Sequence, residues 1–207
     1  MFRGSCGPLY YFLQGLGRDM SDCRGSTPLA HFLQHSGKKE IDSSTALRSA
    51  QNDKGDWLLA HLNELSESDF DLLSRAPKFN VVHCPRSHTF FGHSSFALKK
   101  LRALGFNICL GTDSLASTSS LSLFSEMREL LRKESWISPR EVLAMATVNG
   151  AQALGLEHSL GRIRKGALSD LIAIPHSQND PDIYEKIVAF EGSIPWMMVN
   201  GEPLNPP

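Results

Sequence analysis

Residues 57–135 alternate short apolar runs with longer amphipathic runs, and this alternation constrains the fold more than any other feature of the chain. The apolar runs are WLLAH (57–61), NVVHCP (80–85) and NICLGTD (107–113). Short apolar runs bounded by turn residues are typical of buried strands. The order strand, helix, strand, helix, strand, helix predicts parallel βα units joined by right-handed crossovers.

The amphipathic runs carry the start and stop signals of helices. We expect helices within residues 66–77, 96–105, 120–135 and 138–147. Ser66 precedes Asp69 by three residues, and Ser138 precedes Glu141 by three, which is the spacing of a capping box. Glycine or proline follows the first two runs as a stop signal. After about residue 158 the pattern changes to short strands with glycine turns, in residues 160–175 and 194–204, which predicts a small β appendage.

A histidine or an aspartate stands at the end of each predicted strand. These residues are His61, His83 and Asp113, separated by 22 and 30 residues, or about one βα unit each. A lone histidine at a strand end is more often a structural hydrogen-bonding group, because a buried polar side chain needs a partner. Three polar strand ends in successive units favour an active site, since the carboxyl ends of parallel strands line it. Histidine and aspartate also suit a catalytic metal, and Asp113 suits a general base.

Composition excludes several classes of protein. The net charge is −1 and basic residues are scattered, so we expect no binding to nucleic acid or to a membrane surface. The four cysteines form no CxxC pair, and we expect Cys84 and Cys109 to be reduced in buried strands. No run approaches the ~18 apolar residues of a membrane span, and no secretory signal is visible, so a cytoplasmic protein is expected. A phosphate-binding domain is not expected, because no P-loop and no GxGxxG follows a strand.

Six motifs occur in an order that resembles the C-terminal half of the metal-dependent amidohydrolase superfamily. They are AH, VVHCPRSH, LGTDS, LFSEMR, ATVNGAQALG and GRIRKGALSDLIAI. The most similar branch contains guanine, cytosine and S-adenosylhomocysteine deaminases and triazine chlorohydrolases. The resemblance implies an α/β fold: the C-terminal half of a (β/α)8 TIM-like barrel in residues 1–158, from after strand 5 through strand 8, and part of a small β-sandwich in residues 159–207.

The resemblance also implies roles for the polar strand ends. Asp113 matches the aspartate after the eighth strand, which binds metal and moves a proton. His61 matches the histidine after the sixth strand, which contacts substrate or metal-bound water. His83 and His88 are expected to contact substrate, with His88, like His93, in the loop after the seventh strand. His88 stands where many relatives have asparagine. The expected cofactor is a divalent metal, zinc or iron.

Parts of the family pattern are missing. No His-x-His pair occurs, and residues 1–33 resemble the stretch just after the fifth strand. We therefore expect half of an enzyme that associates with a complementary N-terminal half or with itself. The expected reaction is metal-dependent hydrolysis of a non-peptide C–N bond, by deamination, or of a C–halogen bond in a cyclic or heteroaromatic small molecule. The alternative is a non-catalytic half-barrel subunit or a degenerate remnant of such an enzyme.

Overall fold

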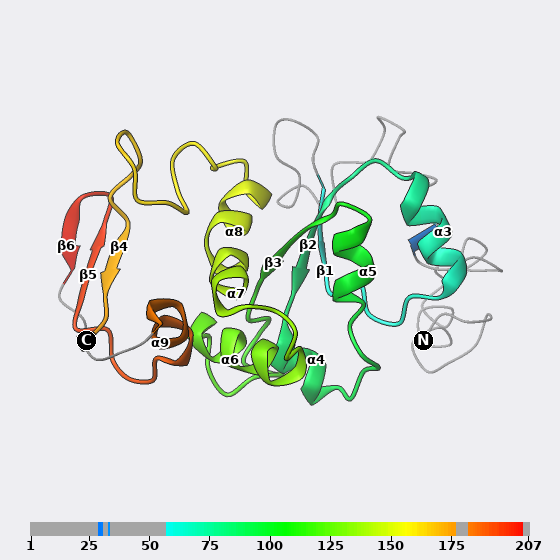
Figure 1. Cartoon of the computed structure of the whole chain (residues 1–207), viewed down its shortest axis with the longest axis horizontal. Coiled ribbons are helices and arrows are strands. Elements are labelled where there is room, and N and C mark those ends of the chain that lie inside the picture. Colours follow the sequence, from blue (N-terminus) through cyan, green and yellow to red (C-terminus); the bar gives the residue numbers. More distant parts are fainter. Residues whose placement is uncertain (1–28, 31–32, 34–56, 177–181, 205–207) are drawn as a thin grey trace, which may run out of the picture. The chain divides into compact units, whose positions relative to one another are not determined.

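The computed structural model describes residues 29–30, 33, 57–176 and 182–204 (Figure 1). The chain divides into two compact units. One unit comprises residues 1–48 and 65–77, and the other comprises residues 49–64 and 78–207. The segment expected after a fifth barrel strand, residues 1–33, lies outside the described residues apart from residues 29–30 and 33, which are helical.

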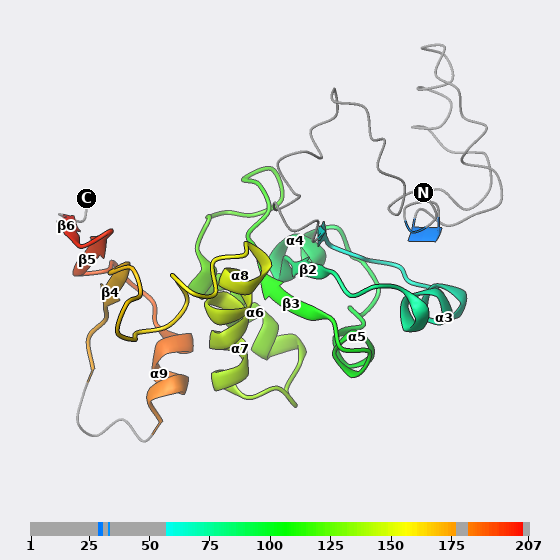
Figure 2. The same cartoon turned by 90° about the horizontal axis from the view of Figure 1, so that it is seen from above.

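The three predicted strands form one parallel sheet in the order β1-β2-β3 (Figure 1). Figure 2 shows β2 and β3 from above, side by side. Their bounds are Leu58–Ala60, Asn80–His83 and Asn107–Leu110. Val81 and Ile108 lie side by side in the register and are almost fully buried. Burial of this kind explains why the strands read as continuous apolar runs rather than as an alternation of apolar and polar residues. The prediction of parallel βα units is confirmed.

The predicted helices form with the expected boundaries to within a few residues. They are α3 (Glu67–Arg75), α5 (Leu98–Ala103), α6 (Leu123–Lys133) and α7 (Pro139–Ala146). A further helix, α8 (Val148–Ala153), follows α7 within the motif ATVNGAQALG. Both capping boxes are present, between Ser66 and Asp69 and between Ser138 and Glu141. Each box satisfies main-chain N–H groups that the first helical turn leaves without partners. Within the larger unit, α6, α7 and α8 pack against β3.

Helix α4 (Pro85–Phe90) was not predicted, and neither was helix α9 (Ile183–Ala189) in the C-terminal region, where only short strands were expected. Helix α4 directly follows β2, in a segment that the sequence pattern predicts to be a loop. Pro85 stands at its first position, where the fixed φ of proline suits a helix and its missing N–H costs nothing. Six residues are too few to show an apolar period, which is why the pattern did not reveal this helix. His88 therefore lies on a helix, while His93 lies in the loop that follows it.

The C-terminal strands form a separate antiparallel sheet in the order β4-β5-β6. They are Leu171–Ala173, Trp196–Val199 and Glu202–Leu204. Helix α9 (Ile183–Ala189) lies between β4 and β5 in the sequence and packs on α6 and α7. The short strands were predicted, whereas the domain boundary at residue 158 stays a prediction. Within the described residues, no helix is both long and apolar enough to cross a membrane.

Candidate active site

The three polar strand ends lie at one edge of the parallel sheet. The N–H of His61 donates to Val82 O at 2.8 Å, and the N–H of Gly111 donates to His83 O at 3.0 Å. Ladder hydrogen bonding thus continues one residue beyond β1 and beyond β3. This continuation brings His61 and His83 to the same edge, with Asp113 two residues past the last bond.

Both ends of this edge carry left-handed backbone. The φ angles are 72° at His61, 50° at Leu62, 59° at Glu64 and 59° at Asp113. Such a conformation costs roughly 1–2 kcal/mol for a residue with a Cβ, and strained residues of this kind concentrate at functional sites. The left-handed conformation also interrupts the alternation of side chains along the strand. The alternation of β1 therefore does not determine on which face of the sheet the His61 side chain lies.

Asp113 is held by two hydroxyl groups. Its Oδ2 accepts hydrogen bonds from Ser87 Oγ at 2.5 Å and from Ser117 Oγ at 3.0 Å. The Ser87 hydrogen bond lowers the pKa of Asp113, helped by Ser117 and by the charge of His61, against a smaller opposing effect of burial. Asp113 is therefore a carboxylate at neutral pH, and His61 lies within electrostatic reach of it. A carboxylate beside an imidazole can accept and pass on a proton.

Ser87 is positioned by a second layer of contacts around Arg86. The main-chain N–H of Arg86 donates to Glu126 Oε2 at 2.9 Å, from helix α6. The guanidinium of Arg86 donates to the carbonyl of Ser120 at 3.1 Å and to Ser119 Oγ at 2.5 Å, in the loop after β3. Glu126 is 0% exposed, and burial raises its pKa. Helix α4 thus connects α6 to the loop that carries Asp113.

His83 is held by packing. It is 4% exposed and lies on the same face of β2 as Val81, two residues earlier. Its ring stacks on Phe96 with the centroids 3.8 Å apart and an interplanar angle of 4°. Burial lowers the pKa of His83 to about 3, with further contributions from the charges of His88 and His61. His83 is therefore neutral, and among the described residues its Nδ1 has no hydrogen-bond partner.

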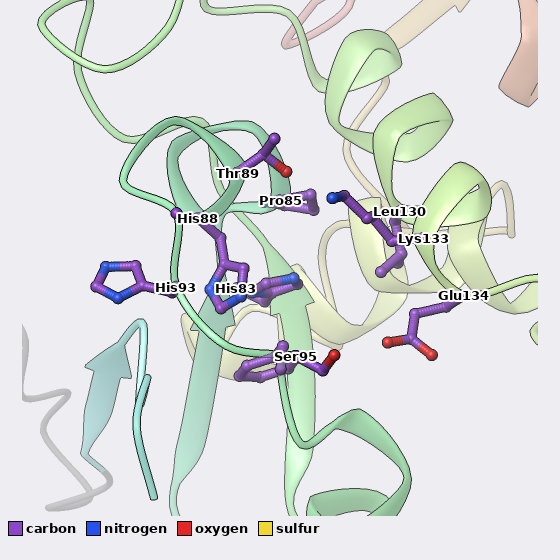
Figure 3. A pocket seen from close by; sticks show the side chains of 11 residues that line it. His83, Pro85, His88, Thr89, His93, Ser95, Leu130, Lys133 and Glu134 are labelled. Carbon is purple, nitrogen blue, oxygen red and sulfur yellow. The ribbon is translucent and has the colours of Figure 1, made fainter.

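His88 lies between His83 and His93 in a row of three imidazoles (Figure 3). Its Nδ1 is 2.8 Å from Asn63 Oδ1, and its Nε2 is 2.7 Å from the carbonyl oxygen of Ser94. Both ring nitrogens are therefore engaged by the protein. A cavity of about 180 Å³ opens beside this row, and His83, His88 and Phe96 line it.

The sequence predicts Asp113, His61, His83 and His88 as site residues but none of the residues that hold them. Those residues are Ser87, Ser117, Asn63, Phe96, Arg86 and Glu126. Glu126 offered one clue, because a glutamate on the apolar side of the helical run LFSEMR is buried and needs a partner. The serines offered none, since hydroxyl residues are common in loops and at helix starts.

The described residues do not complete a metal site. A catalytic zinc usually takes three protein ligands and a water molecule. In the described part of the chain, no group of three or more histidine, cysteine, aspartate or glutamate side chains is placed to hold a metal ion. Asp113 and His61 lie within electrostatic reach of each other, whereas His83 is buried on Phe96. This donor set does not fit a complete zinc site.

Comparison with known proteins gives consistent matches. A family model described as "Amidohydrolase family" matches residues 30–204. The 5-methylthioadenosine/S-adenosylhomocysteine deaminase of Pyrococcus furiosus is 40% identical over 158 residues, covering 70% of this chain and 37% of the relative. The enzyme of the same description from Halalkalibacterium halodurans is 33% identical over 213 residues, covering 95% of this chain and 45% of the relative.

A solved structure gives the same result for the fold. The adenosine deaminase from Xanthomonas campestris, described with bound zinc, superposes with a TM-score of 0.62 at 25% identity. That match covers 70% of this chain and 36% of the other chain. The chain thus spans less than half the length of each of these three relatives.

Proposed function

The chain belongs to the amidohydrolase family, and from this premise we propose that it acts in the hydrolytic deamination of a small heteroaromatic molecule. The relatives above are deaminases of adenosine-like compounds, which supports an aminopurine nucleoside as the substrate class. We further propose that β1–β3 belong to the C-terminal half of a (β/α)8 barrel, and that residues 159–207 form part of a β-sandwich.

The observation that carries the proposal is that Asp113 and His61 lie within electrostatic reach of each other at one edge of the parallel sheet. Hydrolytic deamination adds water to the ring carbon that bears the amino group, and ammonia leaves. Asp113, held in place by Ser87 and Ser117, takes a proton from the attacking water and delivers it to the departing nitrogen. His61 orients the water or the developing tetrahedral centre.

Substrate contact by His83 and His88 stays a prediction. Both rings line the cavity beside β2, which supports a role near the substrate. The nitrogens of His88 are already engaged by Asn63 and Ser94, so contact with substrate would use the carbon edge or face of that ring.

We also propose Asp113 as the ligand that this chain offers to a divalent metal, zinc or iron. Bound zinc in the Xanthomonas campestris deaminase supports zinc. Because the described residues do not complete such a site, the remaining ligands would come from outside the described part. A cytoplasmic location is proposed as well, supported by the free, buried thiols of Cys84 and Cys109.

A non-catalytic role is the alternative. The observation that favours it is the lack of a three-ligand group among the described residues. The two hydroxyl groups that hold the Asp113 carboxylate in place favour catalysis instead, because an exposed aspartate with no role in a site needs no such positioning.

The test is an ammonia-release assay with zinc-supplemented protein. Adenosine, 5-methylthioadenosine, S-adenosylhomocysteine and guanine are offered to the wild type, to Asp113→Asn and to His158→Gln, whose side chain is 82% exposed. Loss of a general base lowers the rate by roughly 10²–10⁴-fold, so Asp113→Asn should fall by that factor while His158→Gln keeps the wild-type rate. A folded wild type that releases no ammonia from any of the four compounds, or an Asp113→Asn variant as fast as wild type, refutes the proposal.

A further inference from the structure

We propose that His88 is a positioning residue that restrains the conformation of the strained loop carrying His61. The inference rests on the proposed function only in the catalytic role that it gives to His61. The loop comprises residues 61–64, which follow β1. Hydrogen bonds of the His88 ring connect helix α4 to this loop and to the segment 91–96.

The loop needs an external restraint. Three of its four residues, His61, Leu62 and Glu64, have φ angles of 72°, 50° and 59°, in the left-handed region. None of them is glycine, and a branched apolar side chain such as that of Leu62 is disfavoured there. A strained conformation persists only where the surroundings fix it by more contacts than the backbone alone provides.

Hydrogen bonds supply that restraint at two successive residues. Asn63 is bonded to His88 Nδ1 at 2.8 Å. Glu64 accepts the N–H of Ser94 on Oε1 and the hydroxyl of Ser94 on Oε2, both at 2.9 Å. His88 Nε2 bonds to the carbonyl of the same Ser94 at 2.7 Å. His88 therefore joins the two loops at the point where Glu64 also joins them.

His88 is itself well anchored. The main-chain N–H of His88 donates to the main-chain carbonyl of Cys84 at 2.9 Å, within the first turn of α4. Helix α4 follows β2 without a break, and β2 pairs with β1. The hydrogen bond between His88 and Asn63 therefore completes a closed set of contacts. It connects the loop after β1 to α4, α4 continues from β2, and β2 pairs with β1. The His83 ring lies edge-on to the His88 ring at 5.3 Å between centroids and limits its rotation.

Both ring nitrogens have defined tasks in this arrangement. The carbonyl of Ser94 can only accept, so Nε2 carries a proton. The amide of Asn63 offers both an acceptor and a donor, so it can bond to Nδ1 whichever protonation state the ring adopts. Asparagine and glutamine can each replace one of these bonds: asparagine reaches the position of Nδ1, and glutamine reaches that of Nε2. The two bonds can therefore be removed separately.

The experiment is residue-resolved hydrogen exchange on the 207-residue chain. The probes are the amides of His61 and Leu62, which bond to Val82 O and Ala60 O, and the amide of Ser94, which bonds to Glu64. We expect His88→Gln, which loses the Asn63 bond, to speed exchange at His61 and Leu62 by about tenfold. His88→Asn, which keeps the Asn63 bond, should leave these two amides near the wild-type rate and speed exchange at Ser94.

Amides of α6 (Leu123–Lys133) report global stability, and His158→Gln is the matched control. Faster exchange at His61 and Leu62 in His88→Gln with α6 unchanged supports the proposal. Unchanged exchange at His61 and Leu62 in His88→Gln overturns it, and so does an equal rise in every segment.

Ammonia release gives a second, separable readout. A positioning residue acts through His61, so His88→Gln should lower kcat with little change in KM, while His88→Asn should restore most of the rate. A rise in KM alone would mean substrate contact and would overturn the positioning role. If no variant or wild type releases ammonia, the proposed function fails, whereas the exchange result still decides whether His88 fixes the loop.

Discussion

Ser87 Oγ donates a hydrogen bond of 2.5 Å to Asp113 Oδ2 and so joins helix α4 to the loop after β3. The bond stabilises the charged form of the carboxylate, and it is the main cause of the lowered pKa of Asp113. A serine that no motif singled out therefore lowers the pKa of the residue that the motifs emphasised.

Removing that hydroxyl should raise the pKa of Asp113. In Ser87→Ala only Ser117 Oγ remains of the two hydroxyl donors, so the carboxylate loses its strongest stabilising contact. The measurement is the pH titration of the Asp113 side-chain carbon by NMR in metal-free protein. Ser119→Ala is the control, because its hydroxyl contacts Arg86 and not Asp113. An unchanged titration in Ser87→Ala would contradict the assignment.

Truncating Glu126 should destabilise the fold. Glu126 is fully buried and accepts the main-chain N–H of Arg86, so Glu126→Ala leaves that donor unsatisfied and opens a cavity. We expect a loss of roughly 2–4 kcal/mol in the free energy of unfolding, measured by urea denaturation. Glu126→Gln keeps an acceptor for Arg86 and should lose less.

The same glutamate should give a pH-dependent stability. Burial raises the pKa of Glu126 above its ordinary value of 4.5. The folded state then holds a proton that the unfolded state releases, so this contribution is full below pH 4.5 and is lost as pH rises through the folded pKa. The free energy of unfolding of the wild type should therefore fall relative to that of Glu126→Gln as the pH rises above 4.5. A constant difference between the two curves would contradict the burial of an ionisable group.

His83 should lower the free energy of unfolding of the protein in mild acid. Its pKa is lowered from 6.5 to about 3 by burial, so below pH 6.5 the unfolded chain gains a proton that the folded chain does not. The free energy of unfolding should then drop by about 2 kcal/mol between pH 7 and pH 5. His83→Phe keeps the stack on Phe96 and removes this dependence, whereas His158→Gln retains it. Parallel urea denaturation curves for wild type and His83→Phe at both pH values would be evidence against the account.

Gly111 should tolerate no side chain. A Cβ there would lie 2.6 Å from Val82 Cγ1 and 3.3 Å from Cys84 Sγ, inside the sheet edge that leads to Asp113. Gly111→Ala should cost about 1–3 kcal/mol in stability, measured by thermal unfolding. Gly150→Ala is the matched control, since nothing lies within 4 Å of its Cβ and alanine favours helix α8. Equal stability of the two variants would be inconsistent with the close approach at Gly111.

The sequence was sufficient for the sheet and for its polar ends. Each strand of the parallel sheet is an apolar run bounded by turn residues, and His61 and Asp113 follow directly from where those runs stop. The family was also predictable, because six motifs in fixed order are far more specific than any single one. The capping boxes at Ser66 and Ser138 were visible because they depend on residues only three positions apart.

The contacts that support the site were not visible from the sequence. The bond between Ser87 and Asp113 spans 26 residues and depends on α4, which is too short to show a helical period. The burial of His83 can be predicted from the alternation of the strand, which places His83 on the same face as Val81. The stacking of His83 on Phe96 cannot be predicted in this way. Left-handed backbone at His61 and Leu62 has no sequence signature either, since neither residue is glycine.

In the proposed mechanism, His61 and Asp113 stand at two strand ends and serve one reaction. The most direct test is a double-mutant cycle in kcat/KM for ammonia release, with His61→Asn, Asp113→Asn and the double variant. Groups that act as a unit on the same attacking water are strongly non-additive, so the double variant should be little slower than the slower single variant. Independent effects that multiply in the double variant would mean that the two residues do not act together, and would contradict the claim.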